Sequence, residues 1–195
     1  MARNIVKAFF SRRPKIVIGE LPPPQRAPRD IPKEAVPELT RGERVLAVAQ
    51  EDASGHWLVL TTYRLLERSS EGLTALERAW HEVDTGTWDP DLWVLSISFT
   101  DGLNGRQWQL KTQTGPGEVP QVLRERTTAT VVLMRVVDLG PRRTARVTVR
   151  KDLATRELDE QVILGRGARS DDAELMASID RARADVRNQA GMPPV

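Results

Sequence analysis

The sequence contains no cysteine, and its 195 residues include only two histidines, His56 and His81. Without cysteine there can be no disulfide, no thiolate zinc site and no cysteine nucleophile. A histidine-based metal site or catalytic triad would need both histidines, or one of them with well-placed carboxylates. The sequence therefore predicts a protein that is not an enzyme and that uses no cofactor and no metal.

Long apolar runs are also missing. The longest ones fall far below the roughly 20 residues that a membrane-spanning helix needs. The segment Ile5–Phe10 is too short for the core of a signal peptide, and Lys7 interrupts it. We expect a cytoplasmic protein, with peripheral association with the membrane as the alternative.

Charge is distributed unevenly along the chain. Residues 1–40 hold eight Lys or Arg and four Asp or Glu, a net charge of +4, whereas the remaining residues hold 21 and 23, a net charge of −2. The overall charge of +2 therefore describes a basic arm on a mildly acidic body. A charge pattern of this kind carries information about partners and not about the fold.

The first 19 residues are basic and carry an apolar stripe. Ile5, Val6, Phe9 and Phe10 would gather on one side of a short helix. Such a segment suits an anionic membrane surface. The alternative is a frayed tail whose apolar side packs on its own domain or on a protein partner. The candidate contact residues of the chain are Lys7, Phe9, Phe10, Arg12, Arg13, Lys15 and, in a later turn-rich stretch, Trp88.

Prolines dominate the rest of the arm. The run Pro22-Pro23-Pro24 favours the polyproline II conformation, and neither a helix nor a central strand can form across it. The segment could be a ligand for a proline-recognising groove, although a plain spacer is the more common use of such a sequence. Residues 1–40 are thus expected to form an extended, basic, proline-rich arm.

Residues 41–112 indicate an antiparallel set of short strands. The densest apolar run, Gly55–Arg68, is apolar on both faces, and we expect strands over 44–52 and 56–66 joined as a hairpin, with a bend of the second strand near Tyr63 as an alternative to a straight one. Further strands are expected near 73–83, 92–99 and 107–111. We place Trp88 in a loop between strands, where it would be exposed to a partner.

Residues 118–190 predict a short helix over 118–126, a buried strand over 127–139, two more strands over 144–150 and 157–164, and a helix over about 171–190. Asp171 with Glu174 forms a candidate capping box. Whether residues 127–164 complete the preceding set of strands or form an extra sheet is open at this stage.

Three other motifs are weak. Asp52, Ser54 and His56 are close in sequence but lie in a turn, where adjacent side chains do not converge. Gly165–Ser170 imitates a phosphate-binding loop, but acidic residues open the helix that follows. The basic stripe around one strand has no interleaved aromatic residue, which disfavours nucleic-acid binding; it consists of Arg142, Arg143, Arg146, Arg150 and Lys151.

Several of these residues carry a resemblance to a family. The segments Gly42-Glu43-Arg44-Val45-Leu46, Thr62-Tyr63-Arg64-Leu65-Leu66 and Trp80-His81-Glu82-Val83 are similar to those of the bacterial pleckstrin-homology-like domains, above all the actinobacterial ones. The resemblance covers residues 41–112 and extends to about 190. It implies an α+β fold with an antiparallel, barrel-like set of strands that ends with one amphipathic helix, and a binding or scaffold role.

The hypothesis is therefore a single pleckstrin-homology-like domain over residues 41–190, preceded by the arm. We expect a non-catalytic scaffold protein that docks a protein partner through the arm and the surface of the domain. The alternative is a peripheral membrane module that binds anionic lipid through Phe9 and Phe10 and the basic residues around them. No small-molecule substrate is expected.

Overall fold

The computed structural model describes residues 31–102 and 105–193. Over this part, the chain is an α+β protein with ten strands in three antiparallel sheets and with two α-helices, the second at the C-terminal end. The described chain divides into two compact units. The first unit consists of residues 31–130 with 151–157, and the second of residues 131–150 with 158–193.

The first sheet of the first unit has four strands in sequential order. They are β1 (Val45–Gln50), β2 (Trp57–Thr61), β3 (Arg64–Arg68) and β4 (Thr74–Ala79). The expectation of one strand over 56–66 is wrong, because the chain turns at Thr62 and Tyr63, where the alternative placed a bend, and the two halves pair as separate antiparallel strands. The Thr61 hydroxyl accepts hydrogen bonds from the backbone N–H groups of Tyr63 and Arg64, at 3.1 and 3.0 Å, and this fixes the tight turn.

The second sheet has three strands, also in sequential order. They are β5 (Val83–Asp89), β6 (Val94–Phe99) and β7 (Arg106–Gln109), and the short 3₁₀ helix η2 (Trp80–Glu82) joins them to β4. The two sheets are not closed into a barrel, so that part of the expected fold is wrong. Since η2 interrupts the strand direction between β4 and β5, no ladder continues from one sheet to the other.

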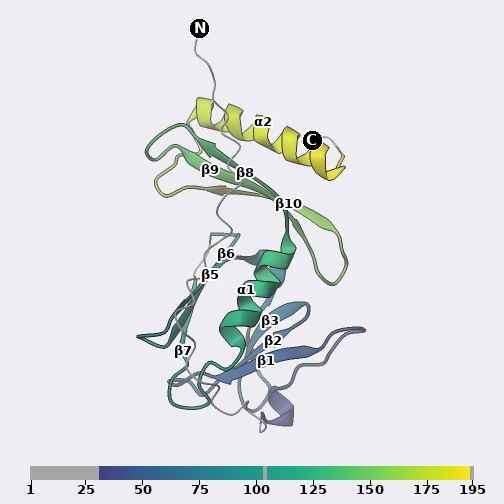
Figure 1. Cartoon of the computed structure of the whole chain (residues 1–195), viewed down its shortest axis with the longest axis vertical. Helices are drawn as coiled ribbons and strands as arrows, with labels where there is room; N and C mark the ends of the chain where they lie inside the picture. Colours follow the sequence, from purple (N-terminus) through teal and green to yellow (C-terminus); the bar gives the residue numbers. More distant parts are fainter. Residues whose placement is uncertain (1–30, 103–104, 194–195) are drawn as a thin grey trace. The chain divides into compact units, whose positions relative to one another are not determined.

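Helix α1 (Val119–Thr130) follows β7 and packs on both sheets of this unit (Figure 1). Its Val119, Val122 and Leu123 join a core that contains Trp80, Trp88 and Trp108. A Cβ on Gly86 would come within 2.6 Å of a Leu123 methyl group, so a residue without a side chain lets the helix approach β5. The buried side chains of this core are those of Ala47, Ala49, Leu58, Leu60, Leu65, Trp80, Val83, Trp88, Leu95, Ile97, Phe99, Trp108, Leu110, Val119, Val122 and Leu123.

The strand expected from residue 127 begins later than predicted. Thr127 and Thr130 are buried on α1, and the Thr130 hydroxyl donates to the Thr127 carbonyl at 2.7 Å. This bond to the preceding turn explains how β-branched residues extend the helix. The β-propensity of the stretch was therefore overridden by packing against the first unit's core.

The second unit is an extra sheet backed by a helix, which answers the question left open for residues 127–164. Its strands are β8 (Val131–Asp138), β9 (Thr144–Lys151) and β10 (Leu158–Leu164), with β9 in the centre, and α2 (Ala173–Ala190) lies along one face (Figure 1). Val147 and Val149 of β9 pack against Leu175, Ile179 and Val186 of α2.

Two local expectations in this unit are wrong. Strand β8 is not buried on both faces, since Val132 and Val136 are 43% and 62% exposed. The residue that caps α2 is Asp172 rather than Asp171, and it accepts a hydrogen bond from the Leu175 N–H at 3.1 Å. At the other end Gly191 adopts a left-handed conformation, as a helix C-terminus favours.

Candidate functional site

The end of the proline-rich arm is attached to the outer face of the first sheet. Ile31 and Ala35 pack with Trp57, Val59 and Leu66 in a small apolar cluster that is separate from the main core. We call this cluster, with the partly buried Val48, the outer cluster. It places the start of the described chain against β1, β2 and β3.

Two arginines of β3 hold the same segment by its backbone. Arg64 donates to the Glu38 carbonyl at 2.7 Å and Arg68 donates to the Glu34 carbonyl at 3.1 Å. Because these contacts are to main-chain oxygens, they fix the path of the chain rather than particular side chains. Residues 31–40, which the sequence assigned to an extended arm, therefore belong to the surface of the first unit.

Glu43, in the first motif of the family resemblance, is the centre of a buried polar network. Arg64 Nε donates to Glu43 Oε1 at 2.9 Å, and the Thr61 hydroxyl donates to the same oxygen at 2.6 Å. Thr40 donates its backbone N–H to the other carboxylate oxygen at 2.9 Å. Burial alone would raise the pKa of Glu43, but the hydrogen bonds from Arg64, Thr61 and Thr40 outweigh it and lower this pKa to about 2.

The neighbouring motif residues also have structural tasks. Gly42 has a φ of +81°, and a Cβ there would lie 2.8 Å from the Tyr63 hydroxyl. The Arg44 N–H donates to the Thr62 hydroxyl at 3.1 Å. The residues that carry the resemblance are thus joined to one another around the turn between β2 and β3, and they explain why this strand pair forms.

Asp52, Ser54 and His56 do not converge on one another's reactive atoms. His56 Nδ1 lies 2.9 Å from Oε1 of the Glu67 carboxylate. The other oxygen of this carboxylate, Oε2, accepts a hydrogen bond from the Trp108 indole N–H at 3.0 Å. The Ser54 hydroxyl donates to Glu51 at 2.6 Å. The Asp52 carboxylate accepts three backbone N–H groups, those of residues 111–113, which link the first β-turn to the segment after β7.

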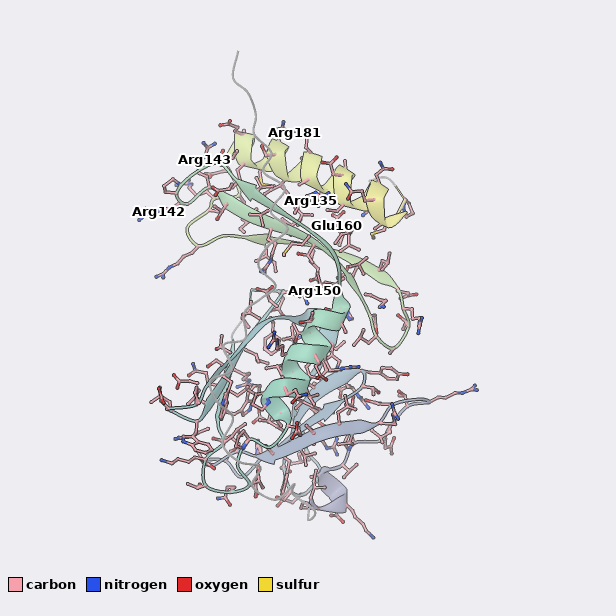
Figure 2. All side chains as sticks on the ribbon, in the orientation of Figure 1. Arg135, Arg142, Arg143, Arg150, Glu160 and Arg181 are labelled. Carbon is pink, nitrogen blue, oxygen red and sulfur yellow. The ribbon has the colours of Figure 1, made fainter. Side chains whose placement is uncertain are left out.

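The glycine-rich loop leads into the N-terminus of α2, where the acidic side chains are paired with an arginine of the same unit. Arg143 binds Asp172 at 2.6 Å and Glu174 at 2.8 Å, and Figure 2 places Arg143 at the turn beside the start of α2. The hydrogen bond from Arg143 is the main reason that the pKa of Asp172 falls to about 2. An incoming phosphate would have to compete with these carboxylates.

The basic stripe is not one continuous surface. Arg142 is exposed at the turn, whereas the Arg150 side chain is buried. The acidic side chain of Glu160, which lies on β10 (Figure 2), binds the helix α2. It contacts Arg183 at 2.6 Å and Arg187 at 3.3 Å.

The predicted contact residues fall into two groups. Lys7, Phe9, Phe10, Arg12, Arg13 and Lys15 lie outside the described residues. Trp88 lies in β5, is only 2% exposed and packs edge-to-face on Trp93 with ring centroids 6.3 Å apart. The expectation of an exposed Trp88 in a loop is therefore wrong, because the Gly86-Thr87-Trp88 stretch pairs with β6.

Sequence reasoning missed the outer cluster. The proline content of residues 28–37 concealed it, because prolines at this density indicate an extended segment that does not pack on its own domain. A usable signal was present in Ile31 and Ala35, two apolar residues four positions apart in a polar stretch.

The described part of the chain has two open surface cavities. One, of about 610 Å³, runs along α1, and the other, of about 450 Å³, adjoins β6 and β7.

Within residues 31–102 and 105–193, no group of three or more histidine or acidic side chains is arranged to hold a metal ion. The same residues contain no helix with the length and apolar character needed to cross a bilayer. Comparison with protein-family models, with curated proteins and with solved structures finds no match for this chain.

Proposed function

We propose that the protein is a non-catalytic scaffold that presents its N-terminal arm to a protein partner from a fixed point on the first unit. The observation that carries the proposal is the attachment of residues 31–40 to the first sheet through the outer cluster and through Arg64 and Arg68. Because residues 31–40 are fixed on the first sheet, the residues that precede them are attached to the domain at a defined point. This attachment restricts where those residues can search for a partner.

We further propose that the first unit is a pleckstrin-homology-like domain. Its seven strands are followed by the single helix α1, whose apolar residues enter the core. This agrees with the resemblance, which implies one amphipathic helix after the strands. The helix-backed sheet of the second unit is then an addition to that domain, and the contact residues proposed for the partner are those of the arm, without Trp88.

The test uses the full chain and a variant in which Phe9 and Phe10 are both replaced by serine. Crosslinking in the native host identifies a candidate partner, which is then purified and titrated against both proteins. We expect micromolar binding by the full chain and at least a tenfold loss in the variant, since two aromatic anchors are removed. The matched control is Leu73→Ser with Leu92→Ser, two exposed apolar residues of the first unit, which should bind as tightly as the unaltered chain.

Vesicles of phosphatidylglycerol and phosphatidylcholine distinguish the membrane alternative. If the full chain sediments with them, salt releases it, and the Phe9 and Phe10 variant remains in solution, the arm is a lipid anchor and the scaffold proposal is wrong. Failure to bind both the purified candidate and the vesicles would also contradict the proposal.

A further inference from the structure

Strand β8 lies at an edge of the sheet of the second unit. It stands at one end of the strand order β10-β9-β8 and pairs with β9 through a ladder that is regular except for a shift between residues 131 and 133. Among the described residues, no backbone group outside β9 forms a backbone hydrogen bond with residues 132–138. The outer edge of β8 therefore presents N–H and C=O groups that another strand can bind.

The side chains at this edge are apolar and exposed. Leu133 and Val137 pack in the apolar cluster beneath α2, whereas Val132, Met134 and Val136 alternate with them and point to the opposite face of the sheet. Val132 and Val136 are 43% and 62% exposed. Apolar side chains on an unpaired edge are the feature that promotes pairing with a further strand.

The two charged residues of β8 are engaged within their own unit. Arg135 donates to the Gln189 side chain of α2 at 2.8 Å and to the Met134 carbonyl at 3.3 Å. Asp138, the last residue of the strand, accepts a hydrogen bond from the Gly140 N–H at 3.0 Å. The strand has neither proline nor lysine, two residues that commonly block pairing at an edge.

The other edge strands are shorter, less apolar or more acidic. Strand β7 has four residues. Within β1, β4, β5 and β7, the only exposed large apolar side chain is that of Val45, at 37%. Strand β10 exposes Val162 and Leu164, at 38% and 36%, but Asp159 and Glu160 precede them on the strand. Pairing with a further strand is therefore most favourable at β8.

A second copy of β8 is complementary to this edge. In an antiparallel pair related by a two-fold axis, one residue lies opposite its own copy and the residues on either side pair reciprocally. With Met134 at the axis, Val132 lies opposite Val136 of the second copy. In the same register, Arg135 lies opposite Leu133 of the second copy, so the two arginines are not opposed.

The other symmetric registers are less favourable. With Arg135 at the axis, two arginines lie opposite each other, and like charges in that position are destabilising. With Val136 at the axis, the Asp138 carboxylate lies opposite Met134. With Leu133 at the axis, Val136 lies opposite the end of α1 and has no strand residue to pair with. Apolar pairing and the separation of like charges therefore both select Met134.

We propose that β8 is a dimerisation edge, which pairs antiparallel with β8 of a second copy of the chain with Met134 at the two-fold axis. The sheets of the two copies then join into one, and both copies of α2 lie on the same face of it. The dimer goes beyond the proposed function and does not depend on it. A dimer carries two arms, which raises the effective concentration for a partner with two binding sites.

The first test uses crosslinking of the full chain, which has no cysteine of its own. We expect Met134→Cys to form a disulfide-linked dimer under mild oxidation, because opposite residues of an antiparallel pair have Cα atoms about 4.5–5.5 Å apart, within the reach of a disulfide. Val136→Cys is the matched control. It should not crosslink, since the two copies of residue 136 lie four residues apart along the strands, roughly 13 Å.

The second test measures the dissociation constant of the full chain by analytical ultracentrifugation, from about 1 μM to 0.5 mM. We expect Val136→Lys to raise this constant by about tenfold or more, because the symmetry places a lysine at two positions of the paired edge. Val162→Lys adds the same charge to β10, at the opposite edge, and should leave the constant unchanged. Thermal unfolding of dilute Val136→Lys should match that of the unaltered chain and so report that the fold is intact.

Four results would overturn the proposal. The full chain could remain monomeric up to about 0.5 mM, or it could form a dimer that Val136→Lys does not weaken. Crosslinking of Val136→Cys but not of Met134→Cys would show that the axis is not at Met134. An assembly that grows beyond two copies and is weakened by Val162→Lys would show that β8 pairs with β10 of the next copy. None of these outcomes depends on whether the arm has a protein partner.

Discussion

Each of the two units contains a glutamate that is almost completely removed from solvent, and the two are held in different ways. The side chain of Glu43 is 0% exposed, and its partners belong to its own turn and to the adjacent β2–β3 turn. The side chain of Glu160 is 6% exposed, and its partners Arg183 and Arg187 come from α2. Glu43 therefore shapes a local turn, whereas Glu160 attaches a helix to a sheet.

The comparison shows why only one of the two glutamates lies in a recognisable motif. Glu43 acts on backbone geometry, so its partners have to stand at fixed positions, at Thr40, Thr61 and Arg64. Glu160 needs only cationic side chains one helical turn apart on the facing helix. Arginines at other positions of α2 could form the same ion pairs with Glu160. The interaction therefore leaves no short, fixed pattern in the sequence.

The largest expected effect tests whether the two units are energetically separate. Leu123→Ala and Leu175→Ala each remove a fully buried side chain, from α1 and from α2, and each should cost about 2–5 kcal/mol. Hydrogen exchange resolved by residue is the measurement. We expect Leu123→Ala to accelerate exchange in β6 and Leu175→Ala to accelerate it in β9. Equal acceleration in both strands by either variant would show that the units unfold as one.

Glu43→Gln should have the next largest effect. The folded pKa of about 2 lies below the ordinary value of 4.5, so the folded protein binds this proton more weakly than the unfolded chain does. The stabilisation is fully present above about pH 4.5 and is lost as the pH falls towards 2. We expect the variant to lose about 2–3 kcal/mol of its free energy of unfolding at pH 7. On acidification, position 43 should contribute little further loss in the variant.

Urea unfolding between pH 7 and pH 2.5 would measure this difference. The unaltered chain should lose stability more steeply with acid than the Glu43→Gln variant does. Parallel curves for the two proteins would mean that Glu43 does not carry the charge that the network implies. Glu118→Gln, at a carboxylate that is exposed just before α1, is the matched control and should leave the slope unchanged.

Glu160→Gln should have the smallest effect of the three, about 1–2 kcal/mol, because Arg183 and Arg187 remain 31% and 18% exposed and water can solvate them. Exchange at β10 and α2 should accelerate while the first unit is unaffected. Asp159→Asn, on the same strand but exposed, serves as the control. If Glu160→Gln lowered the free energy of unfolding by more than Glu43→Gln does, the expected order of the two effects would be wrong. The attachment of α2 to its sheet would then contribute more to stability than the network around Glu43.

Much of the fold could be predicted because periodicity and turn residues are local signals. The alternation in residues 92–99 and 144–150 gave strands that the structure confirms as β6 and β9, and the apolar stripe of residues 171–190 gave α2. The errors have identifiable causes. Trp88 was misplaced because Gly and Asp residues around it suggest a loop, and residues 127–130 were misplaced because β-branched residues suggest a strand. In both places packing in the first unit overrode the local preference.

The sequence by itself determined the α+β class, the basic composition of residues 1–40 and the motif residues around Glu43, since these depend on composition, periodicity and short-range spacing. Only the tertiary structure decided that the sheets stay unclosed, that residues 131–164 contribute to a separate sheet, and that Ile31 and Ala35 pack on the outer face of the first sheet. Those features depend on contacts between residues far apart in the chain. Their partners are chosen by shape and burial, which no local pattern in a single sequence encodes.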